Sequence, residues 1–291
     1  MIWNFPYNSP LAIIELLKEE NLAMNKKFGQ NFLISPPAWE KIVESLGEVE
    51  GQRVWEIGPG LGVLTHLLLK TGALVTAFEI DHGFSRILRE QAFAGEENFT
   101  LVEGDFLKTW PKVFSQAGPP AIICGNLPYN VGSICIASLL EEQCLPERMS
   151  FTLQKEVGER LLAQEGSKLW SPLSILAQID YALDLVVTLN SGVFFPPPKV
   201  DSVVIKFSRR TTPLVKRGER TEFLRVVNDL FTQRRKTVRN NLLNGKTGAI
   251  YGKEGVLEAL TVAGIAESER AEKLSIENLI RLTESLTPSK R

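Results

Sequence analysis

Between residues 53 and 207 the sequence alternates short apolar runs with segments whose apolar residues recur at helical spacing. The runs have the length of β-strands, and they are residues 53–57, 74–80, 100–103, 121–125, 149–154, 183–188 and 202–207. Helical patterns lie between most of them, at residues 61–70, 84–91, 134–142 and 156–163. Strands that alternate with helices of this length are typical of a mostly parallel sheet with helices on both faces. The alternation therefore predicts an α/β fold with a doubly wound, Rossmann-like sheet.

The segments on either side of this region differ from it in pattern. Residues 11–23 follow Ser9-Pro10 and carry apolar side chains at helical spacing, which predicts a short helix. After Thr212-Pro213 the strand pattern ends, and the remaining residues have the pattern of helices and turns. We therefore expect an N-terminal helical extension over 1–25, an α/β domain over 26–210 and a small all-α domain over 211–291.

The composition excludes several classes of protein. No apolar run approaches the roughly 20 residues that a membrane span needs, and the acidic N-terminal segment lacks the basic leader of a signal peptide. The two histidines form no cluster, so we expect no metal site and no histidine-based triad. The cysteines match no zinc or redox spacing, which favours a reducing cytoplasm, and they are Cys124, Cys135 and Cys144. No coiled-coil pattern is present, and we expect a monomer.

Charge is unevenly distributed along the chain, although the net charge is −1. Residues 206–246 hold twelve Lys or Arg against three acids, whereas residues 1–205 carry a net charge of −9. Such segregation suggests a polyanionic partner, although a solvated helical face would show the same pattern. The densest group of cations favours RNA or DNA, and it consists of Arg234, Arg235, Lys236 and Arg239.

The first expected strand runs directly into a glycine-rich turn, Gly58-Pro59-Gly60-Leu61-Gly62. A strand, a glycine turn and a helix in this order let the backbone approach a nucleotide-like ligand closely. Glu79 ends the next strand, where an acid can accept both hydroxyls of a ribose, and Asp105 follows the third strand, near the place of an adenine amino group. The sequence therefore suggests a pocket for S-adenosylmethionine.

A nicotinamide oxidoreductase has a similar turn and is the first alternative. Here the glycine spacing is G-x-G-x-G rather than the G-x-G-x-x-G of dinucleotide-binding folds, and Pro59 stiffens the turn. The sequence also shows no acid or base suited to hydride transfer. These features favour S-adenosylmethionine over a nicotinamide cofactor.

The fourth strand ends in Asn126-Leu127-Pro128-Tyr129. An exocyclic amine on a base is a poor nucleophile, because its lone pair is delocalised into the ring. The Asn126 side-chain oxygen and a main-chain carbonyl at Leu127 or Pro128 can each accept one N–H and localise that lone pair. Tyr129 can stack on a base that has been flipped out of its strand. The string predicts methyl transfer to a base amine through alignment, without a strong general base.

A second unusual string runs from Phe194 to Ser202 and contains three consecutive prolines. Prolines in a row predict a rigid, extended loop that enters the last strand. Phe194 is either a core residue or the aromatic side chain that closes the second face of the base pocket.

These residues resemble the ribosomal RNA adenine dimethyltransferase family, most closely its bacterial small-subunit branch. The strings that carry the resemblance are Lys27-Phe28-Gly29-Gln30-Asn31-Phe32-Leu33, Glu56-Ile57-Gly58-Pro59-Gly60, Gly125-Asn126-Leu127-Pro128-Tyr129-Asn130, Leu153-Gln154-Lys155-Glu156-Val157, Pro197-Pro198-Lys199-Val200-Asp201-Ser202 and Phe231-Thr232-Gln233-Arg234-Arg235-Lys236-Thr237-Val238-Arg239. The resemblance implies a Rossmann-like class I S-adenosylmethionine-dependent methyltransferase domain. It also implies that N6 of two adjacent adenines is dimethylated in a hairpin loop near the 3′ end of 16S rRNA, within an assembling small subunit.

Roles for individual residues follow from the resemblance. It implies that Asn31 and Leu33 contact the cofactor, Gly58 its methionine part, Glu79 its ribose and Asp105 its adenine. Asn126 would touch both the cofactor and the target amine, with the base held between Tyr129 and Phe194. The chain departs from the family at Leu169-Trp170-Ser171-Pro172-Leu173-Ser174, where relatives usually carry Tyr-Gly-Arg/Pro-Leu-Ser.

Two further alternatives remain beside this interpretation. One is a relative that methylates one adenine in large-subunit rRNA and confers antibiotic resistance; the Asn-Leu-Pro-Tyr, Pro-Lys-Val-Asp-Ser and Gln-Arg-Arg-Lys-Thr strings argue against it. The other is a non-catalytic RNA-binding assembly factor that retains the fold. The presence of Glu79, Asp105, Asn126 and Tyr129 together argues against a site that has lost its activity.

Overall fold

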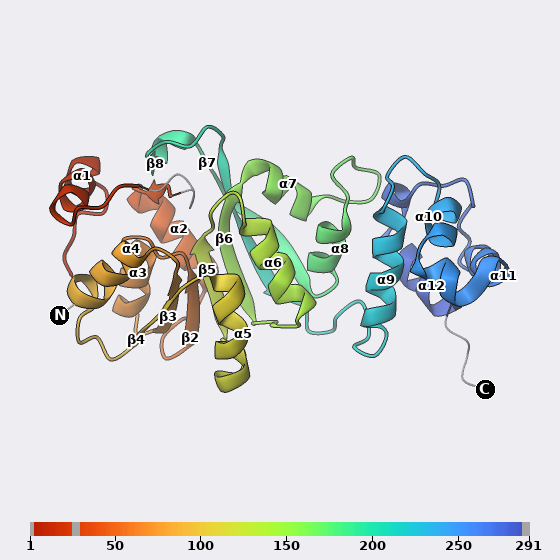
Figure 1. Cartoon of the computed structure of the whole chain (residues 1–291), viewed down its shortest axis with the longest axis horizontal. Helices are drawn as coiled ribbons and strands as arrows, with labels where there is room; N and C mark the ends of the chain where they lie inside the picture. Colours follow the sequence, from red (N-terminus) through yellow and green to blue (C-terminus); the bar gives the residue numbers. More distant parts are fainter. Residues whose placement is uncertain (1–2, 25–29, 287–291) are drawn as a thin grey trace. The chain divides into compact units, whose positions relative to one another are not determined.

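The computed structural model describes residues 3–24 and 30–286, and they form two compact units (Figure 1). One unit contains Met1–Gly158 and Ala182–Arg209, and the other contains Glu159–Tyr181 and Arg210–Arg291. Residues 159–181, expected within the α/β domain, instead group with the C-terminal helices. The expected limit between 25 and 26, and the Lys27-Phe28-Gly29 part of the first family string, lie outside the described residues.

The first unit is built on one mostly parallel sheet with the strand order β4-β3-β2-β5-β6-β9-β7. The strands in chain order are β2 (Arg53–Ile57), β3 (Leu74–Glu79), β4 (Phe99–Glu103), β5 (Ile122–Asn126), β6 (Arg148–Gln154), β7 (Tyr181–Leu189) and β9 (Ser202–Arg209). The pairs from β4 to β6 are parallel, and β9 pairs antiparallel with β6. The doubly wound sheet expected from the sequence is therefore confirmed.

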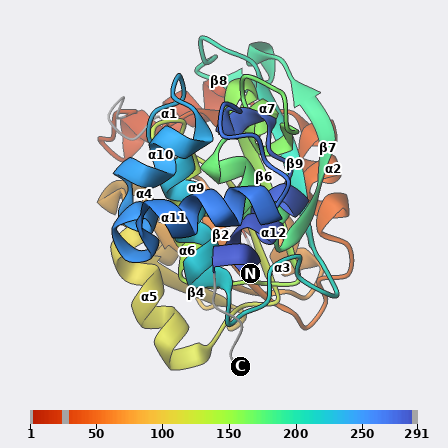
Figure 2. The same cartoon turned by 90° about the vertical axis from the view of Figure 1, so that its right-hand side faces the viewer.

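Helices cover both faces of this sheet, which explains why its central strands carry mainly apolar side chains. Val54 in β2 and Ile122, Ile123 and Cys124 in β5 are fully buried. The helices α2 and α3 lie on one face of the sheet, and α5 and α6 lie on the other (Figures 1 and 2). The helices of the unit are α1 (Pro10–Glu19), α2 (Pro36–Leu46), α3 (Val63–Lys70), α4 (His82–Ile87), α5 (Phe106–Ala117) and α6 (Gly132–Glu141), and α7 (Lys155–Leu162) begins in it.

Two very short strands that the sequence pattern does not predict pair with each other outside the main sheet. β1 (Phe32–Leu33) runs antiparallel to β8 (Phe194–Phe195), with Leu33 opposite Phe194. Strands of two residues carry no measurable periodicity, so only the fold reveals this pairing. It joins the Gln-Asn-Phe-Leu string directly to the start of the proline-containing string.

The second unit is helical and has its own hydrophobic core. Its helices are α8 (Pro172–Gln178), α9 (Arg220–Phe231), α10 (Val238–Asn244), α11 (Lys246–Val262) and α12 (Ile276–Leu286). Trp170, at the departure from the family string, is buried there and its indole N–H donates to the carbonyl of Leu274 at 3.0 Å. A buried ion pair of 2.6 Å between Asp180 and Arg220 ties residues 159–181 to α9. These contacts explain why this segment groups with the C-terminal helices.

Candidate active site

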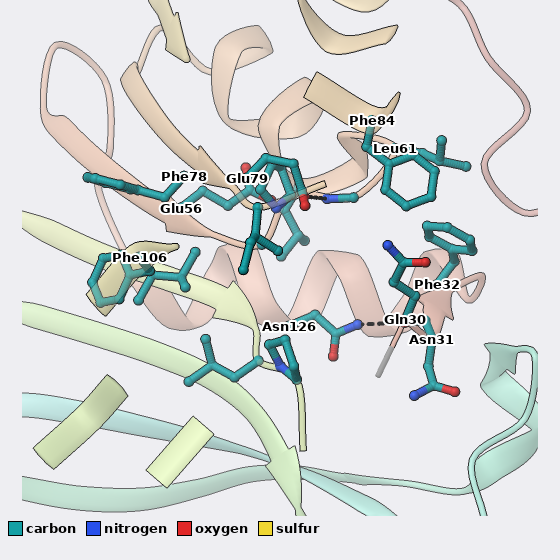
Figure 3. A pocket seen from close by; sticks show the side chains of 18 of the residues that line it. Gln30, Asn31, Phe32, Glu56, Leu61, Phe78, Glu79, Phe84, Phe106 and Asn126 are labelled. Carbon is teal, nitrogen blue, oxygen red and sulfur yellow. Dashed lines mark hydrogen bonds between the residues drawn. The ribbon is translucent and has the colours of Figure 1, made fainter. Parts of the chain in front are cut away.

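A pocket opens at the carboxyl ends of β2, β3, β4 and β5, where the strand order reverses between β2 and β5. Ligands of doubly wound folds bind at this topological switch point. The pocket is lined by most of the residues singled out in the sequence, namely Asn31, Leu33, Gly58, Glu79, Asp105, Asn126, Leu127, Pro128 and Tyr129. Figure 3 shows Asn31 and Phe32 at one end of it and Phe106 at the other.

The glycine turn after β2 forms the floor of the pocket. Gly58 has a φ of 68°, and its N–H donates to the carbonyl of Phe78 at 2.9 Å. A Cβ atom there would lie 3.9 Å from the main-chain oxygen of Asn126, in the space between the two loops. Glycine therefore keeps open a cradle in which backbone can contact a ligand.

Glu79 lies beside this turn and is held by the main chain. One carboxylate oxygen accepts from the N–H of Gly60 at 3.0 Å, and the other accepts from the N–H of Asp81 at 2.9 Å (Figure 3). Burial raises the pKa of Glu79 to about 7, against the lowering effect of these two hydrogen bonds. A carboxylate held in this way has lone pairs left over for the hydroxyls of a ribose.

A second buried acid lies one strand away. Glu56 in β2 also lines the pocket, and it accepts a short hydrogen bond from the hydroxyl of Thr65. Burial and, to a lesser extent, the nearby charge of Glu79 raise the pKa of Glu56 to about 7. The pocket thus contains two carboxyl groups whose charged forms are disfavoured by burial.

Asn126 is the last residue of β5, and its side chain is oriented by a hydrogen bond. Its amide nitrogen donates to the carbonyl of Asn31 at 2.8 Å, which leaves the side-chain oxygen as a hydrogen-bond acceptor (Figure 3). The residue before it must be small, because a Cβ atom on Gly125 would lie 2.4 Å from the carbonyl oxygen of Ile57. The approach of β5 to β2 therefore positions Asn126 on the pocket wall.

The turn after Asn126 also determines which main-chain carbonyl has lone pairs left for a ligand. The carbonyl of Pro128 accepts from the N–H groups of Val131 and Gly132 at 3.1 and 2.9 Å, at the start of α6. With both lone pairs of Pro128 occupied, the carbonyl of Leu127 is the better acceptor for a ligand.

Tyr129 connects the two sequence strings. Its phenol hydroxyl lies 2.5 Å from the hydroxyl of Ser202, the first residue of β9, and burial raises its pKa. Phe194 differs from the expected arrangement: only 2% of it is exposed and it is not among the lining residues. It packs in one hydrophobic cluster with Leu33 because β8 pairs with β1.

Several pocket residues are not indicated by the sequence motifs, and two of them come from the N-terminal segment. Tyr7 precedes α1 and Ile13 lies within it, and both line the pocket. The helix itself is expected from its apolar spacing, but no local pattern shows that it packs beside a glycine turn some fifty residues later.

The four basic residues of the expected RNA-binding group lie at the turn between α9 and α10 and in α10. Arg234 donates to the carbonyl of Lys168 and lies 3.4 Å from Glu272, and Arg239 lies 3.3 Å from Glu267. Arg235 and Lys236 are exposed. Within 3–24 and 30–286, no ion pair involves either of them.

Residues 21–288 match the profile of the family described as ribosomal RNA adenine dimethylase. The chain belongs to this family. It is 38% identical to the ribosomal RNA small subunit methyltransferase A of Treponema denticola over 279 residues, 96% of this chain and 94% of that protein. The protein of the same name from Staphylococcus haemolyticus is 35% identical over 280 residues, 95% of this chain and 94% of that one.

The fold of this chain resembles those of two solved structures. The crystal structure of 23S rRNA methyltransferase ErmE has a TM-score of 0.65 and 27% identity, covering 87% of this chain and 98% of that one. A dimethyladenosine transferase from Plasmodium falciparum has a TM-score of 0.67 and 24% identity, covering 85% and 94%. As a member of the family, the chain is an S-adenosylmethionine-dependent rRNA adenine dimethyltransferase.

The pocket fits this cofactor. It joins the glycine cradle and a main-chain-bound carboxylate to an apolar wall of Phe78, Ile80 and Phe106 that can face a purine. The donor set does not suggest a metal, since no group of three metal-binding side chains exists in the described part of the chain. Within that same part, no helix is long and apolar enough to cross a membrane.

The buried acid Glu56 should make stability depend on pH. Its pKa of about 7 in the folded protein exceeds its ordinary value of 4.5, so the folded state binds the proton more tightly and the free energy of unfolding falls as pH rises between these values. We expect Glu56→Gln to reduce this fall by about 2 kcal/mol and to leave the part of the fall that is due to Glu79, whose pKa is also raised to about 7. Urea denaturation of the ligand-free proteins at pH 5, 6 and 7 measures it, with Glu40→Gln on the exposed side of α2 as a control. Parallel curves for wild type and Glu56→Gln would contradict the assignment.

Proposed function

We propose that this enzyme transfers methyl groups from S-adenosylmethionine to N6 of two adjacent adenines in a hairpin loop near the 3′ end of 16S rRNA. The product would be N6,N6-dimethyladenosine, formed during small-subunit biogenesis. The observation that carries the chemistry is the orientation of Asn126 by the carbonyl of Asn31. The small-subunit target is supported by the names of the relatives described above, which are 35–38% identical to this chain over nearly its whole length.

The cofactor supplies the methyl group as an electrophilic sulfonium when it is bound. The residues of the chain give its orientation: Glu79 accepts the ribose hydroxyls, and Asp105 lies near the adenine end with Phe106. Gly58, Asn31 and Leu33 then surround the methionine part. Asn31 and Phe106 lie at opposite ends of the pocket (Figure 3).

The target amine would be activated by acceptors rather than by a base. The Asn126 side-chain oxygen and the Leu127 carbonyl each take one N–H of the amine, which draws its lone pair out of conjugation. Both acceptors belong to one turn whose geometry is held by Asn31 and by the Pro128 carbonyl, so they need no reorganisation during the reaction.

The base would stack on Tyr129, whose ring is held by the Ser202 hydroxyl. Phe194 takes part on the second face only if the β1–β8 pair shifts, because it is buried and paired with Leu33. The exposed Arg235 and Lys236 would bind RNA phosphates together with Arg234 and Arg239, which makes residues 211–291 the RNA-binding part. Nothing in this scheme requires a metal or a second copy of the chain.

Methyl transfer to ribosomal subunits tests this function. Purified enzyme is incubated with labelled S-adenosylmethionine and hypomethylated small or large subunits, and the nucleosides are analysed by mass spectrometry. We expect dimethyladenosine from the small subunit alone. Label in the large subunit would favour the activity named for the 23S rRNA methyltransferase, and RNA binding without any label would favour an assembly factor.

Removing the acceptor at Asn126 should lower turnover far more than RNA affinity. An interaction made mostly in the transition state changes kcat, so we expect Asn126→Ala to lower kcat on the order of a hundredfold with little change in KM for RNA. Single-turnover assays at saturating cofactor measure this. Asn98→Ala, at an exposed residue before β4, is the matched control. Near-normal turnover in Asn126→Ala would refute amine activation by this residue.

The basic turn should control RNA affinity and its dependence on salt. We expect Arg235→Ala and Lys236→Ala each to lower the slope of log affinity against log salt by about one unit, because each loses one phosphate contact. Filter binding over a range of salt concentrations measures the slope. Lys112→Ala in α5 should leave it unchanged. Arg234→Ala should also lower thermal stability, since its side chain is tied to Lys168 and Glu272.

A further inference from the structure

The segment before and within α1 supplies one wall of the cofactor pocket. Tyr7 and Ile13 are buried and line it. The ring of Tyr7 packs edge-on against Trp39 and His66, with centroid distances of 6.5 and 5.6 Å. Trp39 in turn donates its indole N–H to the carbonyl of Leu33 at 2.8 Å. Tyr7 is therefore linked through Trp39 to Leu33, which also lines the pocket.

This wall is attached to the α/β unit at both of its ends. The N–H of Trp3 donates to the carbonyl of Ala92 at 3.0 Å. After α1, the side chain of Glu20 pairs with Arg86 at 2.8 Å and accepts from Gln91 at 2.6 Å. Tyr7 thus lies in a segment that is held to the α/β unit both before it, by a hydrogen bond of Trp3, and after it, by the contacts of Glu20.

The hydroxyl group of Tyr7 is unusual for its surroundings. It is fully buried, yet it has no hydrogen-bond partner in the part of the chain that the structure describes. A buried hydroxyl without a partner is destabilising by about 1–3 kcal/mol, so buried polar groups are nearly always paired. Burial and the nearby charge of Glu56 both raise the pKa of Tyr7, so the phenol remains a hydrogen-bond donor at neutral pH. An unpaired donor on a pocket wall indicates a partner brought by the ligand.

We propose that the Tyr7 hydroxyl donates a hydrogen bond to the carboxylate of the methionine part of S-adenosylmethionine, and that residues 3–22 form the wall that shields this end from water. The inference rests on the proposed function, in which Glu79 and Asp105 hold the adenosine part and leave the amino-acid part near Leu33. The ammonium group at that end has no lone pair, and the lone pair on the positively charged sulfonium sulfur is a very poor hydrogen-bond acceptor. The carboxylate is the acceptor there, and a charge-assisted hydrogen bond is the stronger kind.

The test compares two ligands that differ only in this carboxylate, S-adenosylmethionine and its decarboxylated form. Isothermal titration calorimetry gives the affinity of wild type and of Tyr7→Phe for each. A hydrogen bond to a charged group predicts that Tyr7→Phe binds S-adenosylmethionine roughly tenfold or more weakly. The same variant should bind the decarboxylated ligand within about twofold of wild type, since that ligand has nothing to accept the bond.

Thermal unfolding without ligand gives a second readout. Tyr7→Phe removes an unpaired hydroxyl, so its Tm should equal or exceed that of wild type. The matched control is Tyr251→Phe in the helical unit, where the hydroxyl donates to Glu222 at 3.0 Å. This control should lower the Tm and leave cofactor affinity unchanged.

The outcomes separate this inference from the proposed function. Unchanged affinity of Tyr7→Phe for S-adenosylmethionine, or an equal loss for both ligands, would overturn the carboxylate contact and leave Tyr7 as a packing residue. If wild type binds neither ligand, the proposed cofactor site itself fails.

Discussion

The parallel hydrogen-bonded ladder through β4, β3, β2 and β5 is the constraint on which the site depends. Its register places Ile57 beside Phe78 and Glu79 beside Glu103, so the residues that follow each strand emerge at one edge. Residues separated by about twenty positions in sequence thereby become neighbours without any direct attraction between them. Because helices cover the sheet on both faces, a slip in its register would disrupt the packing of side chains against both helical layers. The positions of the pocket residues are therefore set by the packing of the sheet.

Close approach at the strand ends then determines the electrostatics of the pocket. The short turn after β2 turns an N–H toward Glu79, and the absence of a side chain at Gly125 lets β5 come within contact of Ile57. Such tight packing excludes water from Glu56 and Glu79, which is why both pKa values rise despite their hydrogen-bond donors. A cation bound beside these groups would favour their charged forms and lower both pKa values.

Much of this arrangement could be predicted from the sequence, and the exceptions share a cause. The strands of the main sheet and the glycine, acid and Asn-Leu-Pro-Tyr positions follow from local periodicity and from where parallel strands end. The β1–β8 pair, the burial of Phe194 and the wall formed by Tyr7 depend on contacts between distant segments whose local patterns are too short or too ordinary to indicate them. The grouping of residues 159–181 with the C-terminal helices has the same cause. It depends on contacts of Trp170 and Asp180 with distant residues, which no local pattern in the sequence indicates.

These long-range contacts also connect the two halves of the chemistry. Asn31 orients the amide of Asn126, and two residues later Leu33 pairs with Phe194 at the start of the proline-containing loop. That loop ends at Ser202, which holds the ring of Tyr129. One continuous set of hydrogen bonds and packing contacts therefore links Asn31, which lines the proposed cofactor site, to the amine acceptor, to Phe194 and to the ring proposed to stack on the base.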